Sequence, residues 1–246
     1  MTEPISASRV QRVRHELKRR ELTVLRVAHT GPHFRRITFT GDSLVNFTSA
    51  SFDDHLKLIL DTGRCEPALR DYTPRRFDTA ARELDIELAL HGDGPAANWA
   101  AQAAPGQRVT IGGPRGSFIV PTDYTWHLLI GDDTALPAVA RRLEELPAGA
   151  RAIVRMMVAD AADRRLPVSA AEVDVQWLAS TDALLASVRA LALPTGDGYA
   201  WCAGEAATTA ALRRIVVDEK GHSRHAIRAA AYWKRGAVAH HENLDG

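Results

Sequence analysis

Cysteine is nearly absent from this sequence. Only Cys65 and Cys202 occur among 246 residues, too few for a disulfide framework and too far apart for a zinc knot. An excess of charge of one sign is also lacking, because 31 Lys and Arg balance 30 Asp and Glu, and a net charge of +1 favours neither a nucleic-acid partner nor a membrane surface. There is no run of ~20 apolar residues that would insert into a membrane and no apolar core of a signal peptide. We therefore expect a cytoplasmic protein.

The composition is that of a folded protein. Hydrophobic residues make up 46% of the chain and charged residues 25%, which excludes a disordered chain and a coiled coil. The length suits one large domain or two small ones. Residues 1–21 form the first segment, in which we predict a basic helix over 8–21 that packs Val10, Val13 and Leu17. An arm that binds nucleic acid or anionic lipid is the alternative interpretation of its arginines.

Two hydrophobic patterns divide the rest of the chain. Over residues 22–122, apolar and polar residues alternate in short segments such as FRRITFTG and LDIELALH, which end in Gly, Pro or polar turns. Over residues 123–246, near-continuous apolar runs such as WHLLIG alternate with helical segments. The first pattern predicts an antiparallel β-barrel and the second an α/β domain with a parallel sheet.

The segment RDYTPRRF carries three different functional groups at one strand edge. Arg70 can form two parallel hydrogen bonds to a pyrophosphate, Tyr72 offers a flat aromatic face, and Thr73 offers a hydroxyl donor. Alternation along a strand places Arg70 and Tyr72 on the same face. A polar hairpin edge with an ordinary ion pair would have the same residues, so the motif alone does not decide between the two.

Two glycine-containing loops follow. HGDGPAANWA, residues 91–100, leads from a strand into a helix that we expect to begin near Ala96. The unpaired amides at such a helix start can bind phosphate oxygens. GGPRGSF, residues 112–118, is a tight loop that turns Arg115 outward. Taken alone, each is also typical of an ordinary turn or hairpin tip.

The α/β domain offers a ligand site where its first strand ends. In open parallel sheets, ligands bind outside the carboxyl ends of the strands, and the segment GDDTA puts Asp132, Thr134 and Ala135 there. Glu205 opens a helix after a later strand, YAWCAG. The dinucleotide fingerprint G-x-G-x-x-G is absent. The histidines are scattered, so we predict no metal site in the protein.

Together and in this order, seven segments resemble the siderophore-interacting protein family. They are FDDHLKL, RDYTPRRF, ELDIELALHGDGPAANWA, GPRGS, GDDTALPAVARRLE, YAWCAGEA and AAAYWKRG, and the resemblance as a whole covers roughly residues 8–236. The resemblance implies an FAD-dependent ferric-siderophore reductase related to the ferredoxin–NADP reductases. It implies an FAD-binding barrel over 22–122, an NAD(P)H-binding α/β domain over 123–246, and reduction of imported ferric chelates in the cytoplasm.

The resemblance also implies roles for individual residues. The flavin motif Arg-x-Tyr-Thr falls on Arg70, Tyr72 and Thr73. The strand end, turn and helix start that hold the pyrophosphate correspond to His91, Gly94, Ala96, Ala97, Asn98 and Trp99. The residues at the nicotinamide side are Asp132, Thr134, Ala135 and Glu205. The family often has Ser where this chain has Ala97, so one hydroxyl contact to phosphate is missing, and Asp133 stands where the family has Glu.

A ferric tris-catecholate is anionic, so its pocket should present cations beside the flavin. The resemblance points to Lys57, Arg115 and Arg228, with Lys234 and Arg235 as further basic neighbours. Three unrelated surface charges are the alternative. We thus expect an anionic catecholate siderophore as the partner of a monomeric protein. No side chain is assigned as a catalytic acid or base, because the flavin supplies the chemistry.

The reductant and the reaction class each have an alternative. Arg164 and Arg165 follow the second strand of the α/β domain, where they would suit the 2′-phosphate of NADPH, whereas Asp160 would suit the ribose of NADH. A general flavin or quinone reductase is the second enzyme class, and a siderophore-binding module without flavin is the non-enzymatic reading. The basic residues and the lack of iron–sulfur cysteines favour the siderophore reductase.

Overall fold

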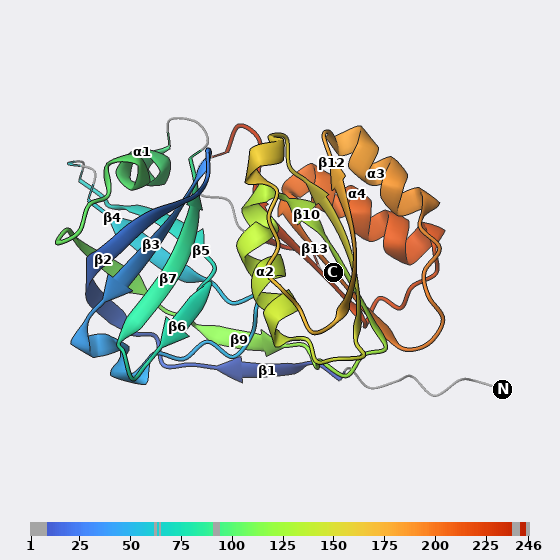
Figure 1. Cartoon of the computed structure of the whole chain (residues 1–246), viewed down its shortest axis with the longest axis horizontal. Coiled ribbons are helices and arrows are strands. Elements are labelled where there is room, and N and C mark those ends of the chain that lie inside the picture. The colour runs from blue at the N-terminus through green and yellow to red at the C-terminus, as the bar shows by residue number, and fades with distance from the viewer. Residues whose placement is uncertain (1–8, 62, 64, 91–93, 238–241, 245–246) are drawn as a thin grey trace.

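The two sequence patterns correspond to two sheets that lie side by side (Figure 1). The structure is a computed structural model, and it describes residues 9–61, 63, 65–90, 94–237 and 242–244. Among these residues, none of the helices is both long enough and apolar enough to cross a membrane.

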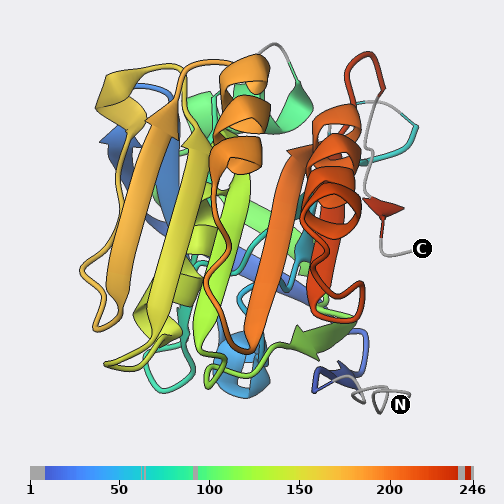
Figure 2. The ribbon, with the colours of Figure 1, turned by 90° about the vertical axis from the view of Figure 1, so that its right-hand side faces the viewer.

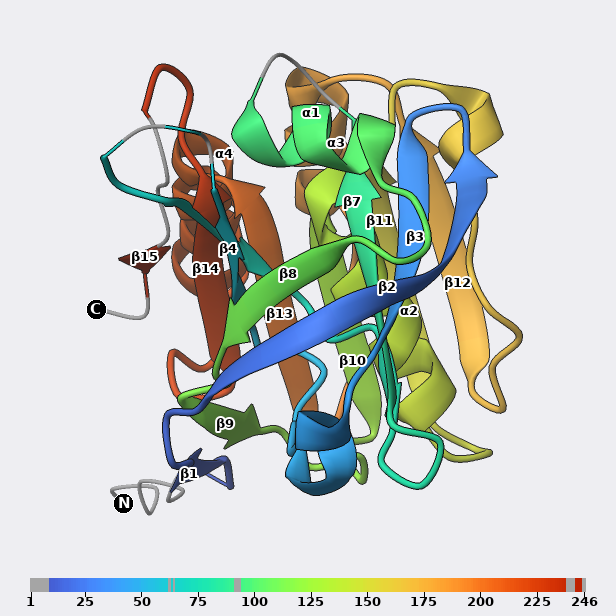
Figure 3. The ribbon, with the colours of Figure 1, turned by 90° about the vertical axis from the view of Figure 1, so that its left-hand side faces the viewer.

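The first sheet is antiparallel and curls into a barrel-like shape (Figure 3). Its spatial order is β5-β4-β8-β2-β3-β7-β6. The strands are β2 (Arg19–Gly31), β3 (Phe34–Thr40), β4 (Leu56–Leu60), β5 (Ala68–Tyr72), β6 (Arg76–Asp78), β7 (Glu83–Ala89) and β8 (Arg108–Gly112). Alternation explains the core, since Leu56, Leu58 and Leu60 point inward while the residues between them are half-buried. Helix α1 (Pro95–Gln102) covers one end of this sheet, and the short 3₁₀ helix η1 (Asp42–Asn46) lies at the other.

The second sheet is parallel apart from one short strand, and its order is β12-β11-β10-β13-β14-β15. The strands are β10 (Trp126–Asp132), β11 (Arg151–Met157), β12 (Glu172–Leu178), β13 (Gly198–Glu205), β14 (Ile227–Trp233) and the antiparallel β15 (Glu242–Asn243). Every residue of β10 is buried, as expected of a strand covered on both faces. The chain order reverses between β10 and β13, so the ligand-binding crevice is expected at their carboxyl ends.

The helices lie on both faces of this sheet. Helix α2 (Leu136–Glu145) packs on the face toward the barrel, where Leu136 and Val139 share a core with Phe34 and Phe52 of the first domain. Helices α3 (Thr181–Ala190) and α4 (Ala206–Arg214) cover the opposite face (Figure 2). The short 3₁₀ segments η2 (Asp133–Ala135) and η3 (Ala161–Asp163) and a π-helical turn, Ile215–Glu219, complete the domain. The predicted fold class is confirmed.

The basic helix predicted over 8–21 is wrong. Its residues instead form β1 (Gln11–Arg14), which pairs with β9 (Gly116–Ile119), and β2 already begins at Arg19. Val13 and Leu17, which were expected to pack as a helical stripe, are exposed. The backbone of this segment bonds to distant strands, and such tertiary pairing outweighs a weak helix propensity.

Candidate functional site

The predicted flavin motif lies at the end of β5 and in the residue that follows it. Arg70 is partly exposed and donates through Nη1 to the carbonyl of Leu69 at 2.9 Å, which leaves further N–H groups of its guanidinium for a phosphate oxygen. Tyr72 packs against the barrel core, and burial raises the pKa of its hydroxyl to about 12. Thr73 is buried, and the carbonyl of the next residue, Pro74, accepts a hydrogen bond from Arg141 of the second domain at 3.0 Å. The motif therefore lies where the barrel meets the parallel sheet.

The predicted helix start is found at the beginning of α1. Gly94 is the N-cap, and no side chain caps the helix. The first intrahelical hydrogen bond runs from the Asn98 amide to the Gly94 carbonyl at 2.9 Å, so the amides of Ala96 and Ala97 precede the helical ladder and can bind an anion. A Cβ atom added to Gly94 would meet nothing within 4 Å, which leaves space beside these amides. His91 lies outside the described residues.

Ala96 and Trp99 of the predicted turn and helix pack into the barrel, whereas the side chain of Asn98 is exposed. Ala96 is buried, and the Trp99 ring stacks on Phe39 with the ring centroids 6.3 Å apart. Trp99 thus holds α1 against the sheet, which keeps the amides at the helix start in place.

The residues predicted at the carboxyl edge of the parallel sheet come together. Asp132 Oδ1 accepts a hydrogen bond from the Thr134 amide at 3.0 Å, and its Oδ2 accepts one from the Glu205 amide at 2.8 Å. Ala135 packs fully buried beside them. A Cβ atom at Gly204, where φ is +141°, would lie 2.4 Å from Asp132 Oδ2, so only glycine allows this approach. Burial raises the pKa of Asp132 to about 6.

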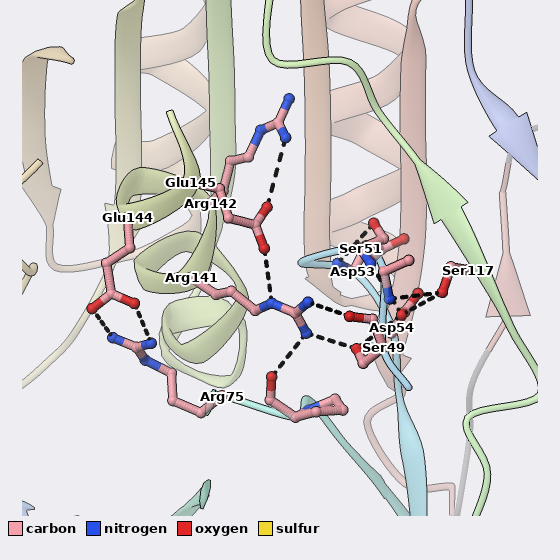
Figure 4. Close-up of polar contacts among 12 residues, drawn as sticks. Ser49, Ser51, Asp53, Asp54, Arg75, Ser117, Arg141, Arg142, Glu144 and Glu145 are labelled. Carbon is pink, nitrogen blue, oxygen red and sulfur yellow. Dashed lines mark hydrogen bonds and ion pairs between the residues drawn. The ribbon is translucent and has the colours of Figure 1, made fainter. Parts of the chain in front are cut away.

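Helix α2 ties the two domains together through arginine side chains (Figure 4). Arg141 donates to Ser49 Oγ at 2.7 Å, to the Ser49 carbonyl at 2.9 Å and to the carbonyl of Pro74, directly after the flavin motif, at 3.0 Å. Ser49 Oγ in turn donates to Asp54 Oδ2 at 2.9 Å, which also accepts from Ser117 Oγ at 2.6 Å. Buried and mutually satisfied, these groups fix the flavin motif relative to α2.

The three basic residues predicted to bind substrate lie in different surroundings. Lys57 Nζ donates to Asp71 Oδ1 at 2.9 Å, across the β4–β5 pair, and Lys57 also lies opposite Gly112, just before the Arg115 loop. Arg115 is exposed. Arg228 is buried, forms an ion pair with Asp53, and lies over the Phe118 ring at 4.3 Å. Lys57 and Arg115 therefore share one corner of the barrel, whereas Arg228 belongs to the contact between the domains.

The two arginines considered for the 2′-phosphate are already engaged. Arg165 donates to Glu87 Oε2 of the barrel at 2.7 Å. Among the described residues, the Arg164 side chain makes only long hydrogen bonds, of 3.3 and 3.4 Å, to the Val158 carbonyl. Asp160 accepts from an amide of η3 at 2.9 Å, which orders the loop after β11. Arg164 is thus the more available of the two cations.

One group of possible metal ligands appears that the sequence did not suggest. The ligand atoms of His33, Asp160 and Asp163 lie within 4.8 Å of one another. His33 Nδ1 and Asp163 Oδ2 are 2.7 Å apart, and the His33 amide donates to Asp163 Oδ1 at 3.1 Å. The group therefore joins the β2–β3 turn to the loop after β11, and this contact accounts for its geometry without an ion.

Comparison with known proteins decides which family uses this arrangement. Residues 124–236 match the model of the siderophore-interacting protein family, and residues 23–68 and 62–118 match its siderophore-interacting FAD-binding domain. The chain is 36% identical to the NADPH-dependent ferric-chelate reductase of Escherichia coli over 91% of its own length and 96% of that protein. The chain belongs to the siderophore-interacting protein family.

Other siderophore-interacting proteins and their relatives agree with this assignment. The ferric vibriobactin reductase of Vibrio cholerae is 30% identical over 91% of this chain and 93% of its own length. The siderophore utilization protein from T. fusca superposes with a TM-score of 0.87 at 32% identity, covering 94% of this chain and 98% of its own. The protein SipS from Aeromonas hydrophila superposes with a TM-score of 0.79 at 30% identity, covering 92% and 93%.

The residues of this siderophore-interacting protein suit FAD. The uncapped amides of Ala96 and Ala97, with open space at Gly94, can bind an anion such as a pyrophosphate, and the Arg70 guanidinium retains N–H groups that can also bind a phosphate oxygen. The cradle is made of backbone, so it does not require the serine hydroxyl that Ala97 lacks.

Sequence reasoning missed several residues of the site. Asp53, Trp201 and Tyr232 form a buried hydrogen-bonded group between the domains, and Arg141 anchors the neighbouring segment. The available signal was the pair of adjacent aspartates in FDDHL, directly before a buried strand, since buried carboxylates require partners. Those partners come from strands more than a hundred residues away in the chain, as in the Trp201–Asp53 bond, so the sequence alone could not name them.

Proposed function

We propose that this siderophore-interacting protein is an FAD-dependent oxidoreductase that passes electrons from NADPH to a ferric siderophore, so that ferrous iron is released. One observation carries the proposal: Arg141 of α2, the helix that follows the carboxyl end of β10, donates at 3.0 Å to the carbonyl of Pro74, directly after the flavin motif. The name of the Escherichia coli relative, an NADPH-dependent ferric-chelate reductase, supports the choice of reductant and substrate.

The site residues would hold two cofactors. Arg70 and the amides of Ala96 and Ala97 would bind the pyrophosphate of FAD, while Tyr72 and Thr73 would contact its ring. His91, Gly94, Asn98 and Trp99 are assigned to the same turn and helix. The nicotinamide cofactor would lie at Asp132, Thr134, Ala135 and Glu205. When bound, FAD would supply the hydride and single-electron chemistry, so the part of the protein's own residues is to bind and orient the two cofactors.

The siderophore would bind beside the corner formed by Lys57 and Arg115. Both carry positive charge at the barrel end that leads into the Arg115 loop, which favours an anionic catecholate. Lys57 shares its charge with Asp71, so Arg115 is the stronger candidate. Arg228, with Asp53 as its partner, would act on the substrate only through the shape of this corner.

Three finer assignments belong to the same proposal. NADPH rather than NADH is the reductant, with Arg164 as the cation for the 2′-phosphate. The enzyme is a monomer, and it works in the cytoplasm.

The competing functions differ in their substrate or in their flavin. A general flavin or quinone reductase would bind FAD and oxidise NADPH, and a siderophore-binding module would do neither. The test is anaerobic mixing of the purified, FAD-loaded protein with NADPH and ferric tris-catecholate, with a ferrous chelator as the trap. Flavin absorbance and trapped ferrous iron are expected. Turnover of a quinone without trapped iron would favour the general reductase, and a protein that takes up no FAD would be the binding module.

A further inference from the structure

We propose that the barrel carries an anion-binding site, separate from the redox site, that takes a phosphate dianion at Arg20, Lys18 and Ser43. Two adjoining hollows, of about 250 and 240 Å³, lie between the start of β2, the link that leads into it from β1, and η1. They are at the end of the barrel opposite α1 (Figure 3), and none of the three basic residues predicted to bind substrate lines either of them. The inference goes beyond the proposed function and does not depend on it.

Arg20 lines both hollows and is a buried cation, only 5% exposed. The other arginines that are buried among the described residues each form an ion pair with a carboxylate, and they are Arg75, Arg141, Arg142, Arg155 and Arg228. Arg20 forms no ion pair with any described residue. A buried charge is costly unless a charge of opposite sign meets it. Arg20 therefore lacks the kind of partner that every comparable arginine has.

The neutral partners of Arg20 leave a donor for an anion. Its Nε donates to the Ser43 carbonyl at 3.0 Å, and its Nη2 donates to the carbonyl and to Oδ1 of Asn46 at 3.2 and 3.0 Å. Among the described residues Nη1 has no hydrogen-bond partner, so its two N–H groups remain for a ligand. Burial lowers the pKa of Arg20, and the charge of Glu16 offsets this only in part. These contacts fix the guanidinium without neutralising it.

The lining of the hollows has an excess of positive charge. Besides Arg20 it includes Arg14, Lys18 and Arg19, and Glu16 is its only acidic member among the described residues. Lys18 Nζ and Glu16 Oε2 are 3.0 Å apart, but this pair is exposed to solvent and contributes little. Arg14 and Arg19 form no ion pair with any described residue. Such a surplus of cations favours a ligand with two negative charges over a ligand with one.

Ser43 adds an unsatisfied hydroxyl to the first hollow. Its Oγ is buried and has no hydrogen-bond partner among the described residues. A buried polar group without a partner is costly, and an oxyanion would accept its hydrogen. The guanidinium of Arg20 and the ammonium of Lys18 are donors without acceptors, so the three groups together fit a ligand that only accepts hydrogen bonds.

Size and shape limit this ligand to a small oxyanion. Pockets for drug-sized ligands measure about 300–1,000 Å³, so a hollow of about 250 Å³ suits a smaller group. The surface of a nucleic-acid duplex or of a membrane would contact the exposed Arg14 and Arg19, but it would not reach the buried Arg20. Arginine binds phosphate through paired N–H groups and lysine binds it as a point charge. A phosphate dianion meets all of these conditions.

The experiment titrates the FAD-loaded protein with inorganic phosphate in a calorimeter, against sodium chloride at equal ionic strength. FAD stays bound so that it occupies the amides of α1. The wild type should bind phosphate saturably, and phosphate alone should raise its melting temperature. Arg20→Met and Lys18→Met should each weaken binding roughly tenfold or more, because each removes a charged donor. The matched control, Arg12→Met, removes the same charge from β1 outside the hollows and should stay within about twofold.

Ser43→Ala separates phosphate binding from folding. Because it removes a buried hydroxyl without a partner, the variant should be at least as stable as the wild type without phosphate, yet it should bind phosphate about tenfold more weakly. Arg20 also holds η1 through two carbonyls, so Ser43→Ala and Lys18→Met decide the question if Arg20→Met does not fold.

Three results would overturn the inference. The first is a phosphate signal no larger than that of chloride. The second is a loss in Arg12→Met as large as that in Lys18→Met, which would show only a general effect of charge. The third is a protein that binds a DNA duplex or anionic lipid vesicles but not phosphate, since the exposed arginines would then form a surface for a macromolecule. None of these results depends on reduction of the flavin by NADPH, so they leave the proposed function to its own test.

Discussion

Arg165 and Glu87 form an ion pair between the two domains, with Arg165 Nη2 and Glu87 Oε2 2.7 Å apart. Glu87 is almost fully buried and also accepts from Arg36 at 2.6 Å, while the Arg165 guanidinium lies over the Phe34 ring at 4.3 Å. An arginine that the sequence suggests for a phosphate is thus part of the domain contact, so we expect its replacement to lower the stability of the protein rather than its affinity for the nucleotide.

The first prediction separates the neighbouring arginines. Arg164→Ala should weaken binding of NADPH by roughly tenfold and leave NADH unaffected, because it removes a cation available to the 2′-phosphate. Arg165→Ala should lower stability by about 1–3 kcal/mol, since it takes one partner from a buried carboxylate. Binding titrations with both nucleotides and thermal unfolding measure the two effects. Equal losses of NADPH and NADH binding in Arg164→Ala would leave Asp160 as evidence for NADH.

The second prediction concerns FAD. Arg70→Ala removes a charge-assisted contact worth about 1.5–3 kcal/mol, so its FAD affinity should fall by roughly 10- to 150-fold. The variant should be as stable as the wild type without flavin, because the Arg70 side chain bonds only to the neighbouring Leu69 carbonyl among the described residues. Fluorescence titration of the apoprotein measures the affinity. A wild-type affinity would show that the motif does not hold the pyrophosphate.

The third prediction concerns the substrate corner. Arg115→Ala should raise the apparent KM for ferric tris-catecholate several-fold but hardly change that for a neutral hydroxamate complex, and added salt should partly mimic the variant because it screens charges beyond about 8 Å. Lys57→Ala should have a smaller effect, since Asp71 already neutralises Lys57. Steady-state assays of both chelates at low and high salt test this. If Arg115→Ala lost activity equally with both chelates, the positive charge of Arg115 would not be what selects the substrate.

Arg228 is the third basic residue that was predicted to bind substrate, after Lys57 and Arg115, and we expect a different result from its replacement by alanine. It removes the cation from the buried Asp53, so we expect a loss of stability of about 3–5 kcal/mol rather than a selective effect on KM. Thermal unfolding of the purified protein is the measurement. A stable variant with impaired catecholate reduction alone would return Arg228 to the substrate site.

The fourth prediction concerns pH. Burial lowers the pKa of His127, on β10, from 6.5 to about 4, with the nearby Arg142 charge acting in the same direction. The folded protein binds this proton less well than the unfolded chain does. The neutral His127 therefore contributes about 3 kcal/mol to the free energy of unfolding. This contribution is complete above about pH 6.5 and is lost as the pH falls toward 4. His127→Gln should flatten the pH dependence of unfolding by that amount in this range. Parallel curves for the two proteins would contradict the buried, neutral histidine.

The sequence by itself determined the architecture, and it supplied the candidate cofactor residues, which stay predictions. The alternation of apolar and polar residues in β4 and the continuous apolar run of β10 are local patterns. Each pattern predicts a strand and its buried residues without knowledge of the neighbouring strands. The same holds for the start of α1, where Gly94 and Pro95 specify a helix with exposed amides.

Only the tertiary structure decided the N-terminal segment and the contact between the domains. Residues 11–14 become a strand because β9 offers them partners, and nothing in their own composition contains that information. Arg228 and Lys57 have the same charge in the sequence, yet one is buried against Asp53 and the other is half-exposed beside Asp71. The role of a charged side chain depends on its desolvation and on the partner that meets it, and both are properties of packing between segments that are distant in the chain.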